Sequence, residues 1–307
     1  MFSYEWYPEA DKGNISTVQI LKNTVSDIGK YAFEGFTALT EVSIPDTVQT
    51  IDAYAFHDCT ALTSVTVPDS VSEIGNYAFS GCTSLTSVKI SDEAMLNVIG
   101  RNAFQNCTAL TSVSLPLWMS EIGVQAFYGC SSLTNIHIPD GITEVKTGTF
   151  RGTKLKSVTL PAGLKTIGAN AFEQTPLTKA EMPGSVTEIR ESAFANCTSL
   201  GTVTLGDSIV QIGAYAFQGC TSLMEVVLPD TAKIISVYSF AGCTGLKSIT
   251  IPKTVTTIAD HAFAAYTSAN TTADNEKQNL SDLTIRGYLN SDAETYANEK
   301  KIKFYAL

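Results

Sequence analysis

One short pattern, Ile-Gly-x-x-Ala-Phe-x-x-Cys, recurs along almost the whole chain and constrains its fold more than any other feature. It is clearest from Ile74 to Cys82. Successive copies of its Phe lie 22 to 25 residues apart, at positions 33, 56, 79, 104, 127, 150, 172, 194, 217, 240 and 263. A fixed period in the range of roughly 20 to 50 residues is typical of a solenoid, in which stacked coils bury one continuous core. The repeat therefore predicts an α/β solenoid of about eleven coils, and not the two globular domains that 307 residues would otherwise suggest.

Each coil also contains the pattern Leu-x-x-Val-x-Ile-Pro, as in Leu62 to Pro68. Alternate residues of Val-x-Ile would face the core, which predicts a short strand whose middle residue faces outward. Pro would end the strand because it has no N–H to donate. Stacking of these strands predicts a parallel sheet along one side of the solenoid.

The segment after the Pro turn reads Val-x-x-Ile-Gly-x-x-Ala-Phe. A Gly in this place, such as Gly75, suits a backbone position that needs a positive φ or a close approach of another segment. We interpret the Ala-Phe segment as a short helical turn that packs on the core. Only Thr149 and Ser239 replace the Ala, so we expect neighbouring coils to crowd there.

All seven cysteines lie three residues after a repeat Phe, at positions 59, 82, 107, 130, 197, 220 and 243. One Cys per coil at an apolar position indicates a small buried side chain with a free thiol. A disulfide ladder between coils is the less favoured alternative, because seven is odd and all seven cannot pair within one chain. Zinc is not expected, because the cysteines occur singly and never as CxxC.

The composition excludes two classes of function. The net charge is −10, whereas nucleic-acid binding requires clustered Lys and Arg. No apolar run approaches the roughly 18 residues of a membrane span. The N-terminus as written has no signal-peptide pattern, so we expect either an intracellular protein or a chain from which an export signal was trimmed.

The ends of the chain depart from the repeat and predict two caps. Residues 1–24 are expected to form a β-hairpin over the first coil, because Phe2, Tyr4 and Trp6 alternate with polar residues. A binding patch is the alternative interpretation of these aromatic side chains. The solenoid would cover residues 25–289, with a polar surface loop near residues 267–278. A helix followed by a strand would close it at residues 290–307, all within one continuous structural domain.

The repeat is broken in the middle of the chain in two ways. The two coils with Phe150 and Phe172 lack both the Cys and one residue before Leu. An insertion at residues 91–97 and unusual residues after Pro116 are expected to place four apolar side chains along one edge: Met95, Leu96, Leu117 and Trp118. Such a patch favours an interface. The alternative is that the enlarged loop folds over Trp118 and buries it.

The outward-facing positions of the predicted strands carry mostly Ser and Thr. This favours either a soluble surface or a long face, about 50 Å at one strand spacing per coil, for an extended protein or glycan. The residues that depart from the pattern are the candidates for specific contact: His137, Lys179, Glu181, Glu225 and Val227.

No pattern of catalytic residues is found in the sequence. His57, His137 and His261 are the only imidazoles, and none has a metal-ligand spacing such as HExxH. No Ser lies in a GxSxG elbow, and the predicted buried thiols lack an activating partner. Asp residues after the strands, such as Asp69, are read as turn formers and not as calcium ligands. We therefore expect no enzyme activity, no metal and no cofactor.

With its coils aligned, the chain resembles the BspA-like leucine-rich repeat family. The resemblance rests on Leu85-x-x-Val88-x-Ile90 joined to Val71-x-x-Ile74-Gly75-x-x-Ala78-Phe79-x-x-Cys82. It covers residues 25 to 263, and Leu280 to Ile285 complete the last coil. The family implies a curved solenoid with a parallel sheet on its concave face. It also implies a bacterial surface or secreted protein that adheres to host matrix proteins or to other cells.

Three hypotheses on function follow from the sequence. The first is a non-catalytic, monomeric module that binds a protein or glycan ligand outside the cell. The second is a structural spacer that presents other domains. The third, an enzyme with an unrecognised site, is the least favoured. A cytoplasmic location is the alternative to export.

Overall fold

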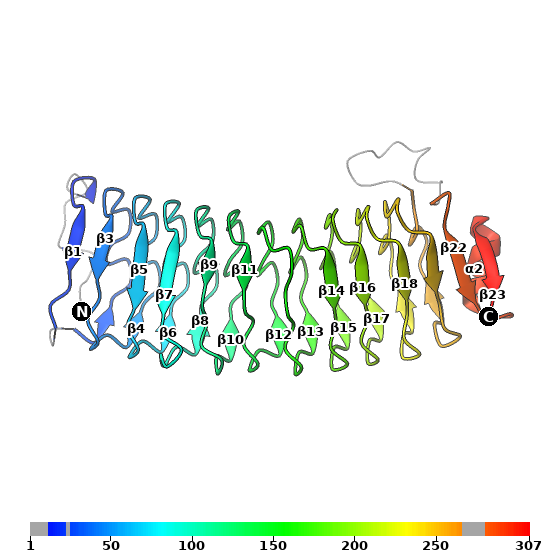
Figure 1. Ribbon diagram of the computed structural model, residues 1–307, viewed down its shortest axis with the longest axis horizontal. Coiled ribbons are helices and arrows are strands. Elements are labelled where there is room, and N and C mark those ends of the chain that lie inside the picture. Colours follow the sequence, from blue (N-terminus) through cyan, green and yellow to red (C-terminus); the bar gives the residue numbers. More distant parts are fainter. Residues whose placement is uncertain (1–11, 23–24, 266–279) are drawn as a thin grey trace. The chain divides into compact units, whose positions relative to one another are not determined.

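The computed structural model describes residues 12–22, 25–265 and 280–307, and these residues form two compact units. Unit 1 consists of residues 1–142 and 148–158, and unit 2 of residues 143–147 and 159–307. The chain is a parallel-sheet solenoid of about 12 turns with little helix, as the repeat predicted. Most coils supply one strand to a first ladder and, after a turn, a two-residue strand to a second ladder (Figure 1).

In unit 1 the two ladders are formed by the following strands. The first ladder contains β1 (Thr17–Gln19), β3 (Glu41–Ser43), β5 (Ser64–Val67), β7 (Ser87–Ile90), β9 (Ser112–Val113) and β11 (Asn135–Ile136). The second ladder contains β2 (Asp27–Ile28), β4 (Thr50–Ile51), β6 (Glu73–Ile74), β8 (Val98–Ile99) and β10 (Glu121–Ile122). All of the pairs are parallel and join equivalent repeat positions, such as Val65 with Val88.

Unit 2 repeats this arrangement and ends in the C-terminal cap. Its first ladder contains β14 (Lys179–Glu181), β16 (Thr202–Thr204), β18 (Glu225–Val227), β20 (Ser248–Thr250), β22 (Thr284–Gly287) and β23 (Lys303–Ala306). Its second ladder contains β12 (Glu144–Val145), β13 (Thr166–Ile167), β15 (Glu188–Ile189), β17 (Gln211–Ile212), β19 (Ile234–Ile235) and β21 (Thr257–Ile258). Helix α2 (Asp292–Lys300) precedes β23.

The helix and strand expected at the C-terminus are therefore confirmed. Ser291 caps α2 by accepting a hydrogen bond from the Glu294 N–H, while the Glu294 carboxylate accepts one from the Asn290 N–H at 2.6 Å. Tyr296 turns its edge to Phe263, with ring centroids 5.9 Å apart. The helix thus covers the apolar end of the last coil.

At the N-terminal end, β1 pairs parallel with β3 through Val18 and Val42. Val18 and Ile20, which we expected in a hairpin, thus belong to the first rung of the solenoid ladder. Phe2, Tyr4, Trp6 and the predicted loop at residues 267–278 lie outside the described residues.

The repeat Phe side chains stack along the core of each unit. In unit 1, Phe79 and Phe104 are parallel to within 1° at a centroid distance of 5.4 Å. In unit 2, Phe194 and Phe217 have the same distance and differ by 2°. All eleven of these Phe residues are buried. Burial of each ring stabilises the fold by about 1.5–3 kcal/mol, so the column is a main source of stability.

The segment around each repeat Phe forms consecutive tight turns and not the helical turn that we expected. The N–H groups of Tyr77, Phe79 and Gly81 donate to carbonyls of the next coil, each at 2.8 Å. Intervening N–H groups close turns within their own coil, such as that of Ser80 to Tyr77. Tyr77 and Gly81 have φ near +59° and +77°, so this coil turns with two left-handed residues.

The Gly of the Ile-Gly pair serves close approach and not a positive φ. A Cβ built on Gly75 would lie 2.7 Å from the Ala53 nitrogen in the preceding coil. The positive φ occurs two residues later, at Tyr77. Absence of a side chain at Gly75 therefore lets two coils meet backbone to backbone.

Every cysteine is free, buried and hydrogen-bonded to the coil before it. The Sγ–H groups donate to repeat-Phe carbonyls, as Cys59 to Phe33, Cys82 to Phe56, Cys107 to Phe79, Cys130 to Phe104, Cys197 to Phe172, Cys220 to Phe194 and Cys243 to Phe217. Thr153 and Thr175 occupy the Cys position in two of the coils that lack it. Their hydroxyls donate to Phe150 and Phe172 of the same coil at 2.9 and 2.8 Å.

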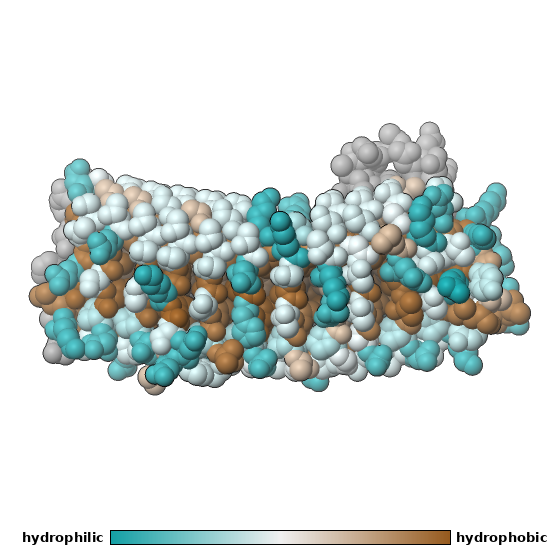
Figure 2. Space-filling view, viewed as in Figure 1, coloured by the Kyte–Doolittle hydropathy of each residue, from teal (hydrophilic) through white to brown (hydrophobic). Residues whose placement is uncertain are grey.

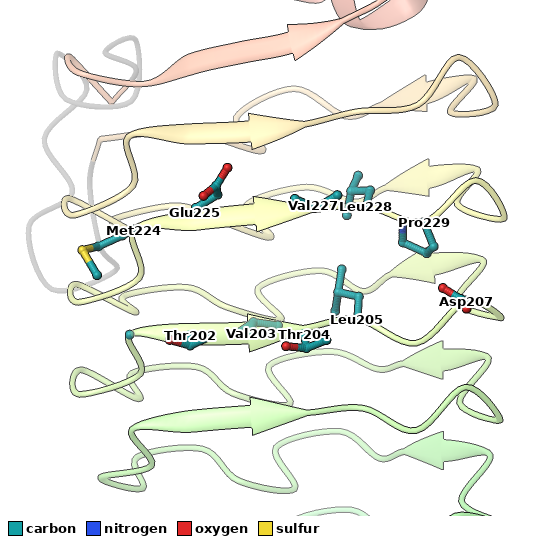
Figure 3. Close-up of a pocket in the computed structure, with 11 residues that line it drawn as sticks. Thr202, Val203, Thr204, Leu205, Asp207, Met224, Glu225, Val227, Leu228 and Pro229 are labelled. Carbon is teal, nitrogen blue, oxygen red and sulfur yellow. The ribbon is translucent and has the colours of Figure 1, made fainter. Parts of the chain in front are cut away.

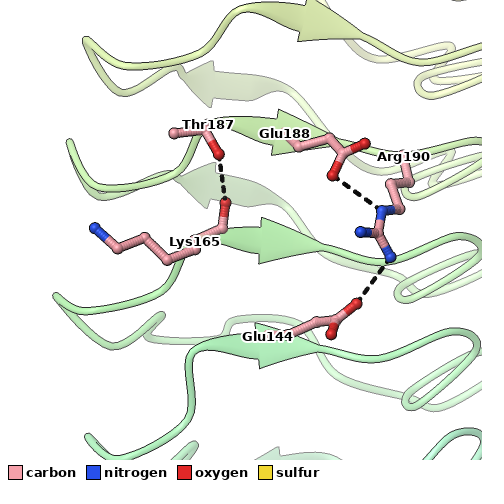
Figure 4. A network of polar contacts seen from close by, with 5 residues as sticks. All are labelled: Glu144, Lys165, Thr187, Glu188 and Arg190. Carbon is pink, nitrogen blue, oxygen red and sulfur yellow. Dashed lines mark hydrogen bonds and ion pairs between the residues drawn. The ribbon is translucent and has the colours of Figure 1, made fainter.

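The outer face of the second ladder in unit 2 carries an exposed polar network (Figure 4). Arg190 donates from Nε to Glu188 at 3.0 Å and from Nη1 to Glu144 at 2.9 Å. Thr187 donates to the Lys165 carbonyl at 3.3 Å. The Thr187 contact joins neighbouring coils, and the Arg190–Glu144 pair spans the coil of β13 between them. Such an exposed ion pair contributes only about 0–1 kcal/mol.

Candidate functional site

The outward side chains of the first ladder form a surface that we call the strand face. In β18 the inward Val226 is buried, whereas Glu225 and Val227 on either side of it are exposed. The same alternation holds in β14, where Lys179 and Glu181 are exposed and form an ion pair with each other. The strand period therefore places these four predicted contact residues on one face of unit 2.

A hollow of about 660 Å³ opens in this face between β16 and β18 (Figure 3). It is lined by Gly201, Thr202, Val203, Thr204, Leu205, Asp207, Met224, Glu225, Val227, Leu228 and Pro229. Val227 is 56% exposed although it is a β-branched apolar residue in a row of mostly polar ones. The hollow thus combines an apolar wall with the carboxylates of Asp207 and Glu225.

The hollow lies where the first ladder is split. β14 pairs with β16, and β18 pairs with β20, but the described residues contain no ladder pairing between β16 and β18. In five coils of unit 1 a Thr after the repeat Leu bridges to the preceding coil, as the Thr86 hydroxyl does to the Thr63 carbonyl at 2.9 Å. Gly201 and Met224 occupy this position beside the hollow and have no hydroxyl to bridge with.

Unit 1 has a related hollow of about 520 Å³ at the ends of its first strands. It is lined by Ile44, Asp46, Thr66, Val67, Pro68, Asp69, Lys89, Ile90 and Ser91. The ladder is split here as well, between β3 and β5. Figure 2 shows apolar side chains along the line where the first-ladder strands end within each unit. The same repeat positions thus form an apolar floor with Asp residues at its rim in both units.

The structure separates the remaining predicted contact residues. His137 is exposed just after β11 in unit 1, so it is not part of the hollow in unit 2. Met95, Leu117 and Trp118 are exposed on the turns of unit 1. Our prediction for Leu96 was wrong: it is fully buried, because it occupies the inward position three residues before Ile99 that Val71 occupies before Ile74.

Sequence reasoning missed Met224, Gly201 and Asp207 as neighbours of Glu225 and Val227. The sequence contained a signal for them, because Gly201 and Met224 replace the Thr that follows the repeat Leu in many other coils. Gly206 also replaces the usual Pro, and a Cβ there would lie 2.3 Å from the Pro183 carbonyl oxygen. Several departures within two adjacent coils therefore coincide with the hollow.

Across the described ranges, no group of three or more His, Cys, Asp or Glu side chains is placed to hold a metal ion. Burial raises the pKa of the Cys59 and Cys130 thiols to about 12, so these thiols remain protonated near neutral pH. The apolar and polar side chains that line the hollow beside Val227 are suited to contact with a ligand surface.

Comparison with known proteins identifies the repeat. A family profile described as BspA type leucine rich repeat region, in six copies, matches residues 10–116, 97–223 and 165–287. These ranges together include every repeat Phe from position 33 to position 263. The comparison with curated protein sequences gave no match.

Solved structures of bacterial repeat proteins resemble the chain. A leucine-rich repeat protein from Bacteroides ovatus is 25% identical, with 95% of this chain and 92% of that chain covered and a TM-score of 0.47. A leucine rich cell surface protein from Faecalibacterium prausnitzii is 23% identical, with 93% and 90% covered and a TM-score of 0.49. The T. pallidum leucine rich repeat protein is 28% identical, with 57% and 72% covered and a TM-score of 0.40.

Proposed function

Because the chain belongs to the BspA-type leucine-rich repeat family, we propose that it is a non-catalytic module that binds another macromolecule through its strand face. Proteins of this family are generally protein-interaction or surface modules and are typically non-catalytic. The observation that carries the proposal is the hollow between β16 and β18 with the exposed Val227 in its wall.

The chemistry of the hollow favours an extended protein segment as ligand. Val227, Leu228 and Pro229 offer apolar contact, whereas Thr202 and Thr204 offer hydroxyl groups that donate and accept hydrogen bonds. Apolar contact combined with a few polar groups is typical of ligand sites. A bound segment that crosses the split in the ladder would also reach the ion pair of Lys179 and Glu181 on β14.

We further propose that the protein acts outside the cell, in adhesion to host matrix proteins or to other cells. The support is the family, whose members are often surface or secreted proteins. Within the described ranges, no helix is long and apolar enough to cross a membrane. The ligand would be a protein or glycan presented on the opposing surface.

The test is a binding screen of the purified chain against immobilised matrix proteins, mucins and glycans. Val227→Lys should weaken binding to the selected ligand at least tenfold, or about 1.4 kcal/mol, because it places a charge in the apolar wall. Ser114→Lys adds the same charge at the equivalent outward position in unit 1 and should leave binding unchanged.

Two outcomes would count against this function. Equal binding by the Val227→Lys and Ser114→Lys variants would exclude the hollow as the contact site. Failure of the whole screen would favour the structural spacer over a binding module.

A further inference from the structure

A second surface in unit 1 differs in chemistry from the strand face. The side chains of Met95, Leu117 and Trp118, which we call the rim patch, are 65%, 59% and 51% exposed. In other coils the corresponding turn positions carry residues such as Asp69 and Ser70. Figure 2 shows apolar atoms on the lower rim beneath β10, where the turns of unit 1 would otherwise be polar. Contiguous exposed apolar side chains that include a Trp are typical of interfaces.

Strand register places Met95 beside Trp118. Val98 and Ile99 pair with Glu121 and Ile122 in the second ladder. The register extends backwards, because the Ser120 N–H donates to both the carbonyl and the side-chain oxygen of Asn97, at 3.2 and 3.0 Å. Two residues earlier on each segment lie Met95 and Trp118, which therefore occupy equivalent turn positions of adjacent coils.

The next coil leaves this patch open. Gly141 occupies the turn position that corresponds to Trp118, and a Cβ on it would lie 2.5 Å from the Met119 carbonyl oxygen. The backbones are therefore in contact, but Gly141 presents no side chain beside the indole ring. The enlarged loop does not bury Trp118, which the sequence had left as an alternative.

The rim patch is held by the backbone and by two buried neighbours. The Met95 N–H donates to the Asp69 carbonyl at 2.8 Å, and the Ala94 N–H closes a turn to Ser91 at 3.1 Å. Leu96 and Met119, which follow Met95 and Trp118, are both fully buried. A surface fixed in this way loses little conformational freedom when a partner binds.

Acidic residues predominate in the turns around the patch, although Lys22 pairs with Asp46 at 3.0 Å and Lys89 shares the unit 1 hollow with Asp46 and Asp69. The turn segments 46–49, 68–72, 91–97, 116–120 and 139–142 of unit 1 contain no Lys or Arg. They contain Asp46, Asp69, Asp92, Glu93 and Asp140. The corresponding turns of unit 2 contain Lys165, Lys233 and Lys253, so these five turns of unit 1 are more acidic than their counterparts.

We propose that the rim patch docks a cationic segment of a partner protein, whose apolar side chains cover Met95, Leu117 and Trp118 while its Lys or Arg residues face the surrounding carboxylates. Charge complementarity guides such encounters, and the apolar contact supplies the anchor. Nucleic acids and anionic lipid surfaces carry the same sign of charge as the rim and would be repelled. This surface is separate from the hollow beside Val227, so either site can be tested without the other.

The test uses the full chain with Trp6→Phe, which leaves Trp118 as the only tryptophan. The probe is a 12-residue peptide that alternates Lys with Leu or Phe, and the readout is the emission of Trp118 during titration. Saturable binding with a blue shift is expected, because the peptide would remove the indole ring from water. A peptide with Glu in place of Lys should not bind, and one with Ser in place of Leu and Phe should bind at least tenfold more weakly.

Matched variants locate the site on the protein. Leu117→Ser should weaken binding at least tenfold, whereas Leu289→Ser, which removes a similarly exposed leucine in unit 2, should change it less than twofold. Asp92→Asn with Glu93→Gln should weaken binding and reduce its dependence on salt. Equal losses in the two leucine variants would overturn the proposal. So would equal binding of the Ser-containing peptide, the Glu-containing peptide or phosphatidylserine vesicles.

Discussion

Cys82 donates its thiol hydrogen to the carbonyl oxygen of Phe56 in the preceding coil, with 3.2 Å between sulfur and oxygen. The thiol is therefore both an apolar filler and a second donor to a carbonyl that also accepts the Cys59 N–H of its own coil at 3.2 Å. A cysteine provides both in a small side chain. This dual role explains why Cys recurs in the coils although no disulfide forms between them.

Removal of this thiol should destabilise unit 1. Cys82→Ala removes one of the two donors to the Phe56 carbonyl and creates a small cavity, so we expect a loss of about 1–3 kcal/mol in the free energy of unfolding. Urea denaturation followed by circular dichroism measures it. Thr83→Ala, one residue along on the exposed side, should change stability by no more than about 0.5 kcal/mol. Similar values for the two variants would show that the thiol bond does not contribute.

The cysteines should also make the fold sensitive to alkaline pH. Burial raises the pKa of Cys59 and Cys130 from an ordinary value of 9.0 to about 12. Their contribution to stability is then fully present below pH 9 and is lost as pH rises towards 12, because the unfolded chain releases these protons first. We expect about 1.4 kcal/mol less stability per pH unit for each such thiol in this range.

Unfolding in urea at pH 8, 9, 10 and 11 measures this loss. Lys and Tyr residues also titrate at these pH values, so the control is the double variant Cys59→Ala, Cys130→Ala. It should be less stable at pH 8 but should lose less stability between pH 9 and pH 11. An unchanged pH slope in the double variant would refute the assignment to the thiols.

Ser239 is a position where the sequence is not optimal for the fold. It replaces the repeat Ala, is fully buried, and its hydroxyl has no hydrogen-bond partner within the described part of the chain. The hydroxyl of Thr149, the other replacement, donates to the Gly123 carbonyl at 3.4 Å. Ser239→Ala should therefore stabilise unit 2 by about 1 kcal/mol or more, measured as a higher melting temperature.

The reverse change in the neighbouring coil provides the control. Ala216 is the repeat Ala before Phe217 and is fully buried. Ala216→Ser should lower the melting temperature by a comparable amount. A lower melting temperature for Ser239→Ala would mean that its hydroxyl finds a partner after all.

The period of the sequence was sufficient to predict the solenoid. Each coil has one Phe and one Val-x-Ile strand, and stacking the coils buries both in one continuous core. Leu96 shows where such reasoning fails. Counting residues forward from the strand at Ser87–Ile90 places Leu96 in the insertion, whereas counting back from Ile99 places it at the inward position, where it is buried. Glu225 and Val227 were recognised because they depart from the repeat. The hollow beside them was not predicted, because it forms where β16 and β18 do not pair. A sequence pattern within one coil gives no information on pairing between coils.

Gly75 provides the strictest test of how closely the coils stack. Its N–H donates to the Ile51 carbonyl at 2.7 Å, and a Cβ at this position would lie 2.7 Å from the Ala53 nitrogen and 2.8 Å from the Asp52 carbonyl carbon. These are backbone atoms, which cannot rotate away. Gly75→Ala should therefore force the two coils apart and destabilise unit 1 by about 1–3 kcal/mol, despite the better conformational propensity of Ala.

Gly184 is the matched control, because a Cβ built there meets nothing within 4 Å and its φ is not positive. Gly184→Ala should be neutral or should stabilise the protein by about 0.4–1 kcal/mol, since Ala reduces the conformational freedom of the unfolded chain. Denaturant unfolding of both variants gives the comparison directly. If Gly75→Ala were as stable as Gly184→Ala, the coils would be able to separate locally at no cost, and backbone contact would not be the reason for Gly after the repeat Ile.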